Sequence, residues 1–358
     1  MTGPATRAWL EIRLGSLVAN ARALAARVGP SALCAVIKSN AYGHGLVPAG
    51  KALAAADIAG LRLGVFAPAE AIALRQAGIT SPLVVLGPQD DAEIERLAAI
   101  GVELALTDDA DAARYPKGAT VHVKVDTGVG RFGGTNDGAA KTIERCRSSG
   151  VRIAGVYSHL ANAEDLDERF TTTQLERLLA VSPPDGAIRH IAASAAAIMW
   201  PRTRLDMVRC GIALYGHWPS DTVRNSNAVG GLTLERALRW FAPVVQLREV
   251  PQGSSVGYGC EFVTKRPSTI AVLPLGYADG LPRAAGNGAL SVRFGDSTAP
   301  IAGRICMNAC MVDATDVRPR VVRGDVAEID VDDVARAAQT IAYEVLARLP
   351  ESVERIYS

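Results

Sequence analysis

Short apolar runs alternate with longer amphipathic segments along the first two thirds of the chain. Eight runs have the length of buried strands, and they lie at residues 33–38, 62–67, 82–87, 102–107, 121–126, 153–160, 189–194 and 207–216. Segments between them, such as 67–78 and 137–150, have the apolar spacing of helices, and the second ends on a typical terminating glycine. Strands that alternate with helices pair in parallel, and eight such units close a barrel. The pattern predicts an α/β fold with an N-terminal (β/α)8 TIM barrel.

The spacing of the apolar runs changes after about residue 236. Closely spaced runs separated by Gly, Pro, Asn and Asp turns predict a C-terminal mainly-β domain, although residues 330–349 have a helical period. A chain of 358 residues is long enough for one large and one smaller domain. We therefore expect a barrel in residues 1–233 and a β-rich domain in residues 234–358, joined through residues 228–235.

Composition and charge narrow the classes of partner. The chain is 49% hydrophobic and 21% charged with a formal net charge of +1, so it has no electrostatic reason to bind nucleic acid or membrane. Charges interrupt the N-terminal stretch, and no run of about 18 apolar residues follows, which predicts a cytoplasmic protein. The six cysteines lack zinc-site spacing, because Cys306 and Cys310 have no nearby histidine. We expect no metal and free thiols.

Polar residues gather at the predicted strand ends, where barrels of this kind place their working site. They are Lys38, Lys124, Asp126, Arg131, His159, His190, Ser194, Arg209, Gly211 and Ile212. An enclosed lysine loses charge stabilisation and becomes able to form a Schiff base. A hydroxyl and two amides after strands seven and eight could hold a phosphate. Pyridoxal phosphate would satisfy both features, but a phosphorylated sugar could use the same anion site.

Several stretches together resemble a known family. They include "AVIKSNAYGHG", "VKVDTGVGRFG", "SHLANAED", "HIAASAAA", "VRCGIALYG", "GSSVGYGCEF", "GYADGLPR" and "GRICMN", and they span nearly the whole chain in the family's order. The sequence is similar to the fold-type III pyridoxal-phosphate enzymes, and among them to the alanine racemase family. The resemblance implies a barrel followed by a β-domain, a pyridoxal 5'-phosphate cofactor and a small amino acid as substrate.

The resemblance also implies roles for individual residues around the cofactor. Lys38 would bind the cofactor covalently, and Arg209 would face its pyridine nitrogen with His190 on the far side. An arginine keeps its proton, so the ring would be a weaker electron sink, which favours simple reprotonation over transamination. The residues expected at the phosphate are Tyr42, Ser194, Gly211 and Ile212.

A second set of residues would act on the substrate. Tyr258 resembles the second catalytic base, which in this family reaches the partner subunit's cofactor, and His159 would orient it. This predicts a head-to-tail homodimer with shared sites. A base on each face of Cα allows inversion, and a positioned base is worth about 10² to 10⁴ in rate. On the substrate side the resemblance implies Arg131, Met307 and Lys124, a lysine often carbamylated in the family.

One departure keeps an alternative open. Asn308 stands where the family usually has aspartate, so a negative charge near the substrate carboxylate is missing. The leading hypothesis is an isomerase that interconverts L- and D-alanine, for peptidoglycan precursors or D-alanine catabolism. The alternative is a racemase of other or broader small amino acids, such as serine. A fold-type III decarboxylase is more distant, because those enzymes have a carboxylate where Arg209 stands. A barrel that only carries the cofactor would lack the β-domain with Tyr258.

Overall fold

The computed structural model describes residues 6–108 and 111–358, which form two compact units. The barrel unit comprises Leu14–Ala41 and Gly45–Ala237. The C-terminal unit comprises Leu238–Ser358, the short segment Tyr42–His44 and the described residues before Leu14. Residues 1–5, part of the stretch on which the cytoplasmic prediction depends, lie outside the described residues.

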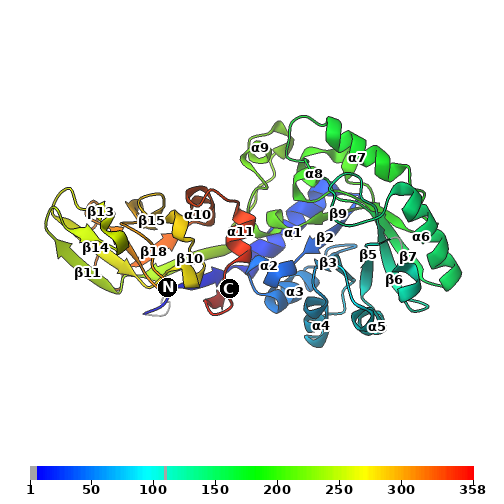
Figure 1. Ribbon diagram of the computed structural model, residues 1–358, viewed down its shortest axis with the longest axis horizontal. Coiled ribbons are helices and arrows are strands. Elements are labelled where there is room, and N and C mark those ends of the chain that lie inside the picture. Colours follow the sequence, from blue (N-terminus) through cyan, green and yellow to red (C-terminus); the bar gives the residue numbers. More distant parts are fainter. Residues whose placement is uncertain (1–5, 109–110) are drawn as a thin grey trace. The chain divides into compact units, whose positions relative to one another are not determined.

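Parallel strands form the barrel sheet at all eight predicted runs (Figure 1). Their bounds are β2 Ala32–Val36, β3 Arg62–Val65, β4 Leu83–Val85, β5 Glu103–Leu106, β6 Thr120–Lys124, β7 Arg152–Tyr157, β8 Ile188–His190 and β9 Met207–Cys210. The runs are mostly apolar because strands of a parallel barrel are covered on both faces. The prediction of an eight-stranded parallel barrel is confirmed.

The barrel is nearly closed. The strands follow one another in the order β8-β7-β6-β5-β4-β3-β2-β9, with β9 paired to β2 in parallel. Across the remaining seam, the Arg209 amide donates to the Ala192 carbonyl at 2.9 Å and the Asp206 amide donates to the Arg189 carbonyl at 3.1 Å. The C-terminal ends of all these strands therefore meet at one rim.

Helices connect the strands around the outside of the barrel (Figure 1). Local signals in the sequence set their ends: Thr135 accepts a hydrogen bond from the Gly138 amide at the start of α6, and Gly150 ends that helix with φ of 70°. The bounds are α1 Leu14–Val28, α3 Leu46–Ala54, α4 Pro68–Gln76, α5 Asp91–Ala99, α6 Asn136–Ser149, α7 Arg169–Leu179 and α8 Ser194–Met199, with α9 Asp221–Arg224 after β9. The segment labelled α2, Lys38–Tyr42, is a left-handed turn after β2.

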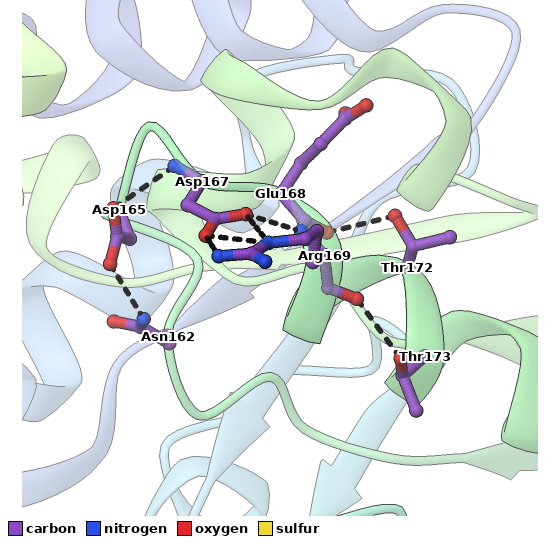
Figure 2. A network of polar contacts seen from close by, with 7 residues as sticks. All are labelled: Asn162, Asp165, Asp167, Glu168, Arg169, Thr172 and Thr173. Carbon is purple, nitrogen blue, oxygen red and sulfur yellow. Dashed lines mark hydrogen bonds and ion pairs between the residues drawn. The ribbon is translucent and has the colours of Figure 1, made fainter.

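A surface network of polar contacts precedes α7 (Figure 2). Asp165 accepts hydrogen bonds from the Asn162 side chain and the Asp167 amide, both at 3.0 Å. Asp167 in turn pairs with Arg169, whose guanidinium lowers the pKa of that carboxyl to about 2. These contacts order the loop that leads from the end of β7 to the first turn of α7.

The C-terminal unit is β-rich, as predicted. A mainly antiparallel sheet has the order β16-β15-β18-β10-β1-β19, and smaller sheets contain β11-β14-β17 and β12-β13. The strands are β1 Trp9–Ile12, β10 Leu238–Pro243, β11 Gln246–Val250, β12 Ser255–Val256, β13 Phe262–Val263, β14 Ser268–Leu273, β15 Ser291–Phe294, β16 Ser297–Pro300, β17 Cys310–Asp313, β18 Val326–Ile329 and β19 Glu354–Tyr357.

Two features of this unit were not evident in the sequence. The N-terminal strand β1 pairs with β10 and β19, far along the chain, so the first residues cluster with the C-terminal unit. The helical period over residues 330–349 corresponds to two helices, α10 Val331–Ala337 and α11 Ala342–Ala347. The first ends because Gln339 adopts a left-handed φ of 55°.

Two further observations concern the described residues alone. None of their helices is long and apolar enough to cross a membrane. No group of three or more His, Cys, Asp or Glu side chains among them is arranged to hold a metal ion.

Candidate active site

Lys38 stands two residues beyond β2, at the start of an unusual turn. Ser39 to Tyr42 all have φ between 51° and 55°, so the chain makes a left-handed turn. Such a conformation costs about 1–2 kcal/mol for each residue with a side chain. The Ala41 amide bonds the Ile37 carbonyl at 2.9 Å, and the Asn40 side chain accepts from the Leu46 amide at 2.7 Å. This turn fixes the backbone that presents Lys38.

The environment of Lys38 favours its neutral amine. Its Nζ lies 5.6 Å from the centre of the Phe66 ring. Burial lowers the pKa of Lys38, and the positive charge of Arg131 lowers it further, against the opposing effect of Glu70. A lysine whose pKa is lowered reaches its neutral form more readily, and the neutral amine can act as a nucleophile and as a base.

Lys124 is a second buried amine at the end of β6. Its Nζ lies 4.6 Å above the centre of the Tyr157 ring. Burial, followed by the charges of Arg209 and Arg131, lowers the pKa of Lys124 to about 7. The nearby Asp126 carboxylate accepts hydrogen bonds from the backbone amides of residues 128–130, each at 2.9 Å, and so orders the turn that carries Arg131.

Arg209, on β9, is buried and bound on several sides. Its Nη1 donates to His190 Nδ1 at 2.7 Å. Its Nη2 donates to the Ser158 carbonyl at 2.8 Å and to His159 Nδ1 at 3.1 Å. Burial and the charge of Arg209 hold the pKa of both histidines well below the ordinary value, so both rings are neutral. Each therefore keeps its remaining proton on Nε2.

The predicted phosphate-binding residues of the barrel lie together after β8 and β9. Ser194 begins α8, and its Oγ accepts a hydrogen bond from the Gly211 amide at 3.1 Å. Ile212 follows directly and begins a short 3-10 turn, Ile212–Tyr215. The hydroxyl and the loop after the last strand are thus brought to one place, as the sequence predicted for an anion site.

Tyr42 packs within the C-terminal unit. Its ring centre lies 6.3 Å from that of Tyr343, on α11. The segment Tyr42–His44 is further held because Arg355 Nε donates to the Gly43 carbonyl at 2.8 Å. Sequence reasoning did not identify Tyr343, whose only local signal is an aromatic residue early in an amphipathic helix.

The other predicted residues of the C-terminal unit are on its surface. Tyr258 is 69% exposed and Met307 is 56% exposed. Tyr258 begins a tight 3-10 turn between β12 and β13, in which Gly257 and Gly259 both have positive φ. Asn308, next to Met307, is exposed as well.

Two buried residues at the site were missed from the sequence. The Tyr157 ring stacks on His190 with centres 4.8 Å apart and lies 5.3 Å from the Arg209 guanidinium carbon. His122 Nδ1 lies 3.0 Å from His190 Nε2. The sequence did contain a signal for His122. Side chains alternate between the two faces of a strand, so His122, two residues before Lys124, lies on the same face of β6 as Lys124.

The side chains at the barrel mouth fit an anionic cofactor. Like charges crowd this mouth: the charges of Arg131 and Arg209 lower the pKa of Lys38 and of Lys124, and the charge of Arg131 lowers the pKa of Arg209. A phosphate and a carboxylate would relieve this repulsion. The buried Tyr157 hydroxyl also has no hydrogen-bond partner among the described residues. A phosphate-bearing pyridine is compatible with this donor set.

The barrel, its cationic rim and the β-rich unit define an enzyme of the fold-type III class. Residues 12–219 match the family described as alanine racemase, N-terminal domain, and residues 237–357 match alanine racemase, C-terminal domain. The chain therefore belongs to the alanine racemase family, which uses pyridoxal phosphate.

Relatives match over the full length. The alanine racemase of Desulforamulus reducens is 36% identical over an alignment that covers 98% of this chain and 98% of that protein. The structure of alanine racemase from Clostridium difficile 630 has a TM-score of 0.91 and 31% identity, and covers 100% of this chain and 96% of that chain. The structure from Bacillus anthracis, with bound L-Ala-P, has a TM-score of 0.87 and 27% identity, with coverage of 100% and 96%.

Proposed function

We propose that this chain is a pyridoxal-phosphate-dependent alanine racemase that interconverts L-alanine and D-alanine with Lys38 and Tyr258 as its two bases. The observation that carries the proposal is the placement of Lys38, beyond β2, within the field of the buried cations Lys124 and Arg209. The full-length membership of the alanine racemase family supports the same reaction.

The barrel would hold the cofactor through residues from several strand ends. Lys38 would bind it covalently, and Arg209 would donate a hydrogen bond to its ring nitrogen, braced from behind by His190. The phosphate would be held by Tyr42, Ser194, Gly211 and Ile212. When bound, pyridoxal phosphate supplies an electron sink that makes the Cα proton of an amino acid easier to remove.

Inversion at Cα is the task of the two bases. One base takes the proton from one face, and the other gives its own proton to the opposite face, so the configuration changes and no net proton is consumed. Lys38 is suited to this because burial lowers its pKa. His159 has its Nδ1 occupied by Arg209, which leaves the Nε2 proton to hydrogen bond the Tyr258 oxygen.

The remaining residues would bind the substrate carboxylate. Arg131 and the backbone amide of Met307 would face it, with Asn308 beside them. Lys124 would hold Arg131 in place after its neutral amine adds carbon dioxide and releases a proton, since a carbamate is anionic. The pKa of about 7 for Lys124 supports this modification, because much of the amine is deprotonated at neutral pH.

The proposed assembly is a head-to-tail homodimer with two shared sites. Residues 1–233 would bind the cofactor of one subunit, and residues 234–358 would present Tyr258 to the cofactor of the other. The exposure of Tyr258 and Met307 on one unit supports the dimer, because large apolar side chains on a surface commonly mark an interface. A cytoplasmic location and the absence of nucleic-acid and membrane partners stay predictions.

A panel of amino acids tests the reaction and its substrate. Purified protein loaded with pyridoxal phosphate is given each L-amino acid in turn, and D-product formation and carbon dioxide release are measured. We expect alanine to be racemised fastest and the Lys38→Ala protein to be inactive. Faster turnover of serine or a longer side chain would favour the broader racemase that Asn308 leaves open, and carbon dioxide release would favour a decarboxylase.

A further inference from the structure

A chain of hydrogen bonds crosses the interior of the barrel behind Arg209. Arg209 Nη1 lies 2.7 Å from His190 Nδ1, and His190 Nε2 lies 3.0 Å from His122 Nδ1. His122 Nε2 then lies 2.9 Å from Glu103 Oε2, which also accepts from Arg62 Nε at 3.3 Å. We name Arg209, His190, His122 and Glu103 the barrel relay.

The chemistry of its ends fixes the direction of every hydrogen bond. Arginine can only donate, so His190 accepts on Nδ1 and carries its proton on Nε2. That proton is donated to His122 Nδ1, which places the proton of His122 on Nε2. The Glu103 carboxylate can only accept, so it receives this last proton. The barrel relay is therefore a one-way chain that requires one tautomer at each histidine.

The backbone is shaped to bring His122 into this chain. The pairing of β6 with β7 shifts register between Val121 and His122, and such a bulge re-aims the side chain beside it. Opposite, Gly155 provides the space, because a Cβ there would lie 2.5 Å from His122 Nδ1. The register shift and the glycine both allow His122 and His190 to come into contact.

The cations around Arg209 explain why a carboxylate at the other end of the barrel relay is useful. Arg209 is buried, and its neighbours Lys124 and Arg131 are also cations. Glu103 is the first residue of β5, at the opposite end of the strand from the cationic rim. Burial raises the pKa of Glu103, but hydrogen bonds from His122 and Arg62, together with the charge of Arg62, outweigh burial and leave the pKa lowered. Glu103 is thus a stable anion.

We propose that Glu103 and His122 are positioning residues that act through His190 to hold the Arg209 guanidinium charged and oriented toward the cofactor ring. This inference rests on the proposed function for the effect on catalysis. The relay itself, however, is a property of the protein without cofactor. The Glu103 carboxylate, linked to Arg209 through the two histidine rings, stabilises the positive charge of the guanidinium. A carboxylate placed directly at the pyridine nitrogen of the cofactor would instead favour a protonated pyridine.

The first test reads the tautomers in cofactor-free protein. Nitrogen NMR of the five histidine rings distinguishes Nδ1–H from Nε2–H, and single histidine replacements assign the signals. We expect His122 and His190 to be entirely Nε2–H. In Glu103→Leu the Nε2 proton of His122 loses its acceptor, so the His122 signals should shift, whereas Glu103→Gln, whose amide oxygen still accepts, should retain them. Glu328→Leu, which breaks the Arg239–Glu328 pair of the C-terminal unit, is the matched control.

The second test follows the consequence for the holoenzyme. Glu103→Leu should weaken cofactor binding and lower kcat by about 10- to 100-fold, the loss typical when the partner behind a ligating histidine is removed. The KM for alanine should change little, because the relay does not face the substrate carboxylate. His122→Gln can accept from His190 and donate to Glu103, so it should retain most activity, whereas His122→Leu should not.

The two tests separate this proposal from the proposed function. If the wild-type protein racemises no amino acid, the proposed function fails, and the tautomers still decide whether the relay exists. An Nδ1 proton on either histidine would overturn the relay. So would folded Glu103→Leu protein whose His122 signal and cofactor affinity match those of Glu328→Leu. Should Glu103→Leu not fold, the comparison of His122→Gln with His122→Leu decides, and equal cofactor affinity and kcat would overturn the proposal.

Discussion

The two units of this molecule treat charge in opposite ways. In the C-terminal unit, Arg239 and Glu328 on adjacent strands form a two-pronged pair with distances of 2.9 and 2.7 Å, which raises the pKa of the arginine. At the barrel rim, Lys38, Lys124 and Arg209 lie close to other cations, and burial lowers the pKa of each. The Arg239–Glu328 pair neutralises its charges locally, and the barrel rim leaves its cations largely unneutralised.

This difference indicates where binding energy is available. Paired surface charges contribute little, because each partner is already satisfied and water screens both. Crowded buried cations are unfavourable in the protein alone, so an anionic ligand that neutralises them binds more strongly. The left-handed turn after Lys38 adds a second unfavourable feature at the same rim. The barrel is therefore the unit prepared for ligand, and the C-terminal unit is expected to act through exposed side chains.

The largest expected effect comes from removing one base of each unit. Lys38→Ala and Tyr258→Phe should each lower kcat/KM by about 10² to 10⁴. Tyr258→Phe should leave the unfolding transition unchanged, because the side chain is exposed. Tyr357→Phe, another exposed tyrosine of the same unit, serves as the control.

Mixing the two inactive proteins then tests whether the units of different subunits work together. Hybrid dimers should recover about one working site, since one subunit keeps Lys38 and the other keeps Tyr258. Tyr258→Phe protein with wild-type activity would remove the C-terminal unit from the chemistry. Failure of the mixture to regain activity would instead argue against shared sites.

A smaller effect is expected from Lys124 on stability. The pKa of Lys124 in the folded protein, about 7, is below the value near 10.4 of an unfolded chain. Between these values the unfolded chain holds the extra proton, so stability rises with pH, and below pH 7 the contribution is flat. With Lys124 as the free amine, in cofactor-free protein kept without carbon dioxide, the free energy of unfolding should gain about 2–3 kcal/mol between pH 7 and pH 9 from this residue.

Variants isolate that contribution. Lys124→Met should remove this rise, because methionine does not titrate, while Lys141→Met, at an exposed position of α6, should keep it. Chemical denaturation at a series of pH values is the measurement. An equal slope in the two variants would mean that Lys124 is not the source, and the contrast between the units would then rest on Arg209 and Lys38 alone.

The sequence predicted the barrel well because its strands depend on local order. Each apolar run is bounded by turn residues, and Lys38 was placed by where the first run ends. The relay from His190 to Glu103 depends on which strands become neighbours and on an irregularity in the pairing of β6 with β7, and neither leaves a local signal. The strand β1 was not predicted for the same reason, because its partner strands lie more than two hundred residues away in the sequence.

The smallest expected effect concerns an ion pair beside Tyr258. Glu261 binds Arg304 and accepts from the Asn287 side chain at 2.7 Å, and Arg304 packs against Gly259 in the Tyr258 turn. Hydrogen bonding to Arg304 lowers the pKa of Glu261 to about 2, below its unfolded value, so its contribution is lost only as pH falls from about 4.3 toward 2. At neutral pH the pair is intact but solvated.

Glu261→Gln should therefore lower kcat by a few-fold at most and leave the unfolding transition nearly unchanged, because water replaces most of an exposed ion pair. Asp316→Asn, which breaks the exposed Arg266–Asp316 pair, is the matched control and should change neither quantity. Steady-state kinetics at neutral pH and again at high salt provide the measurement. A loss as large as that of Tyr258→Phe would mean that electrostatics also positions the base of the C-terminal unit. Both units would then depend on charge for catalysis. The difference between them would be that the charges of the barrel rim bind the ligand, whereas an ion pair of the C-terminal unit positions the tyrosine base.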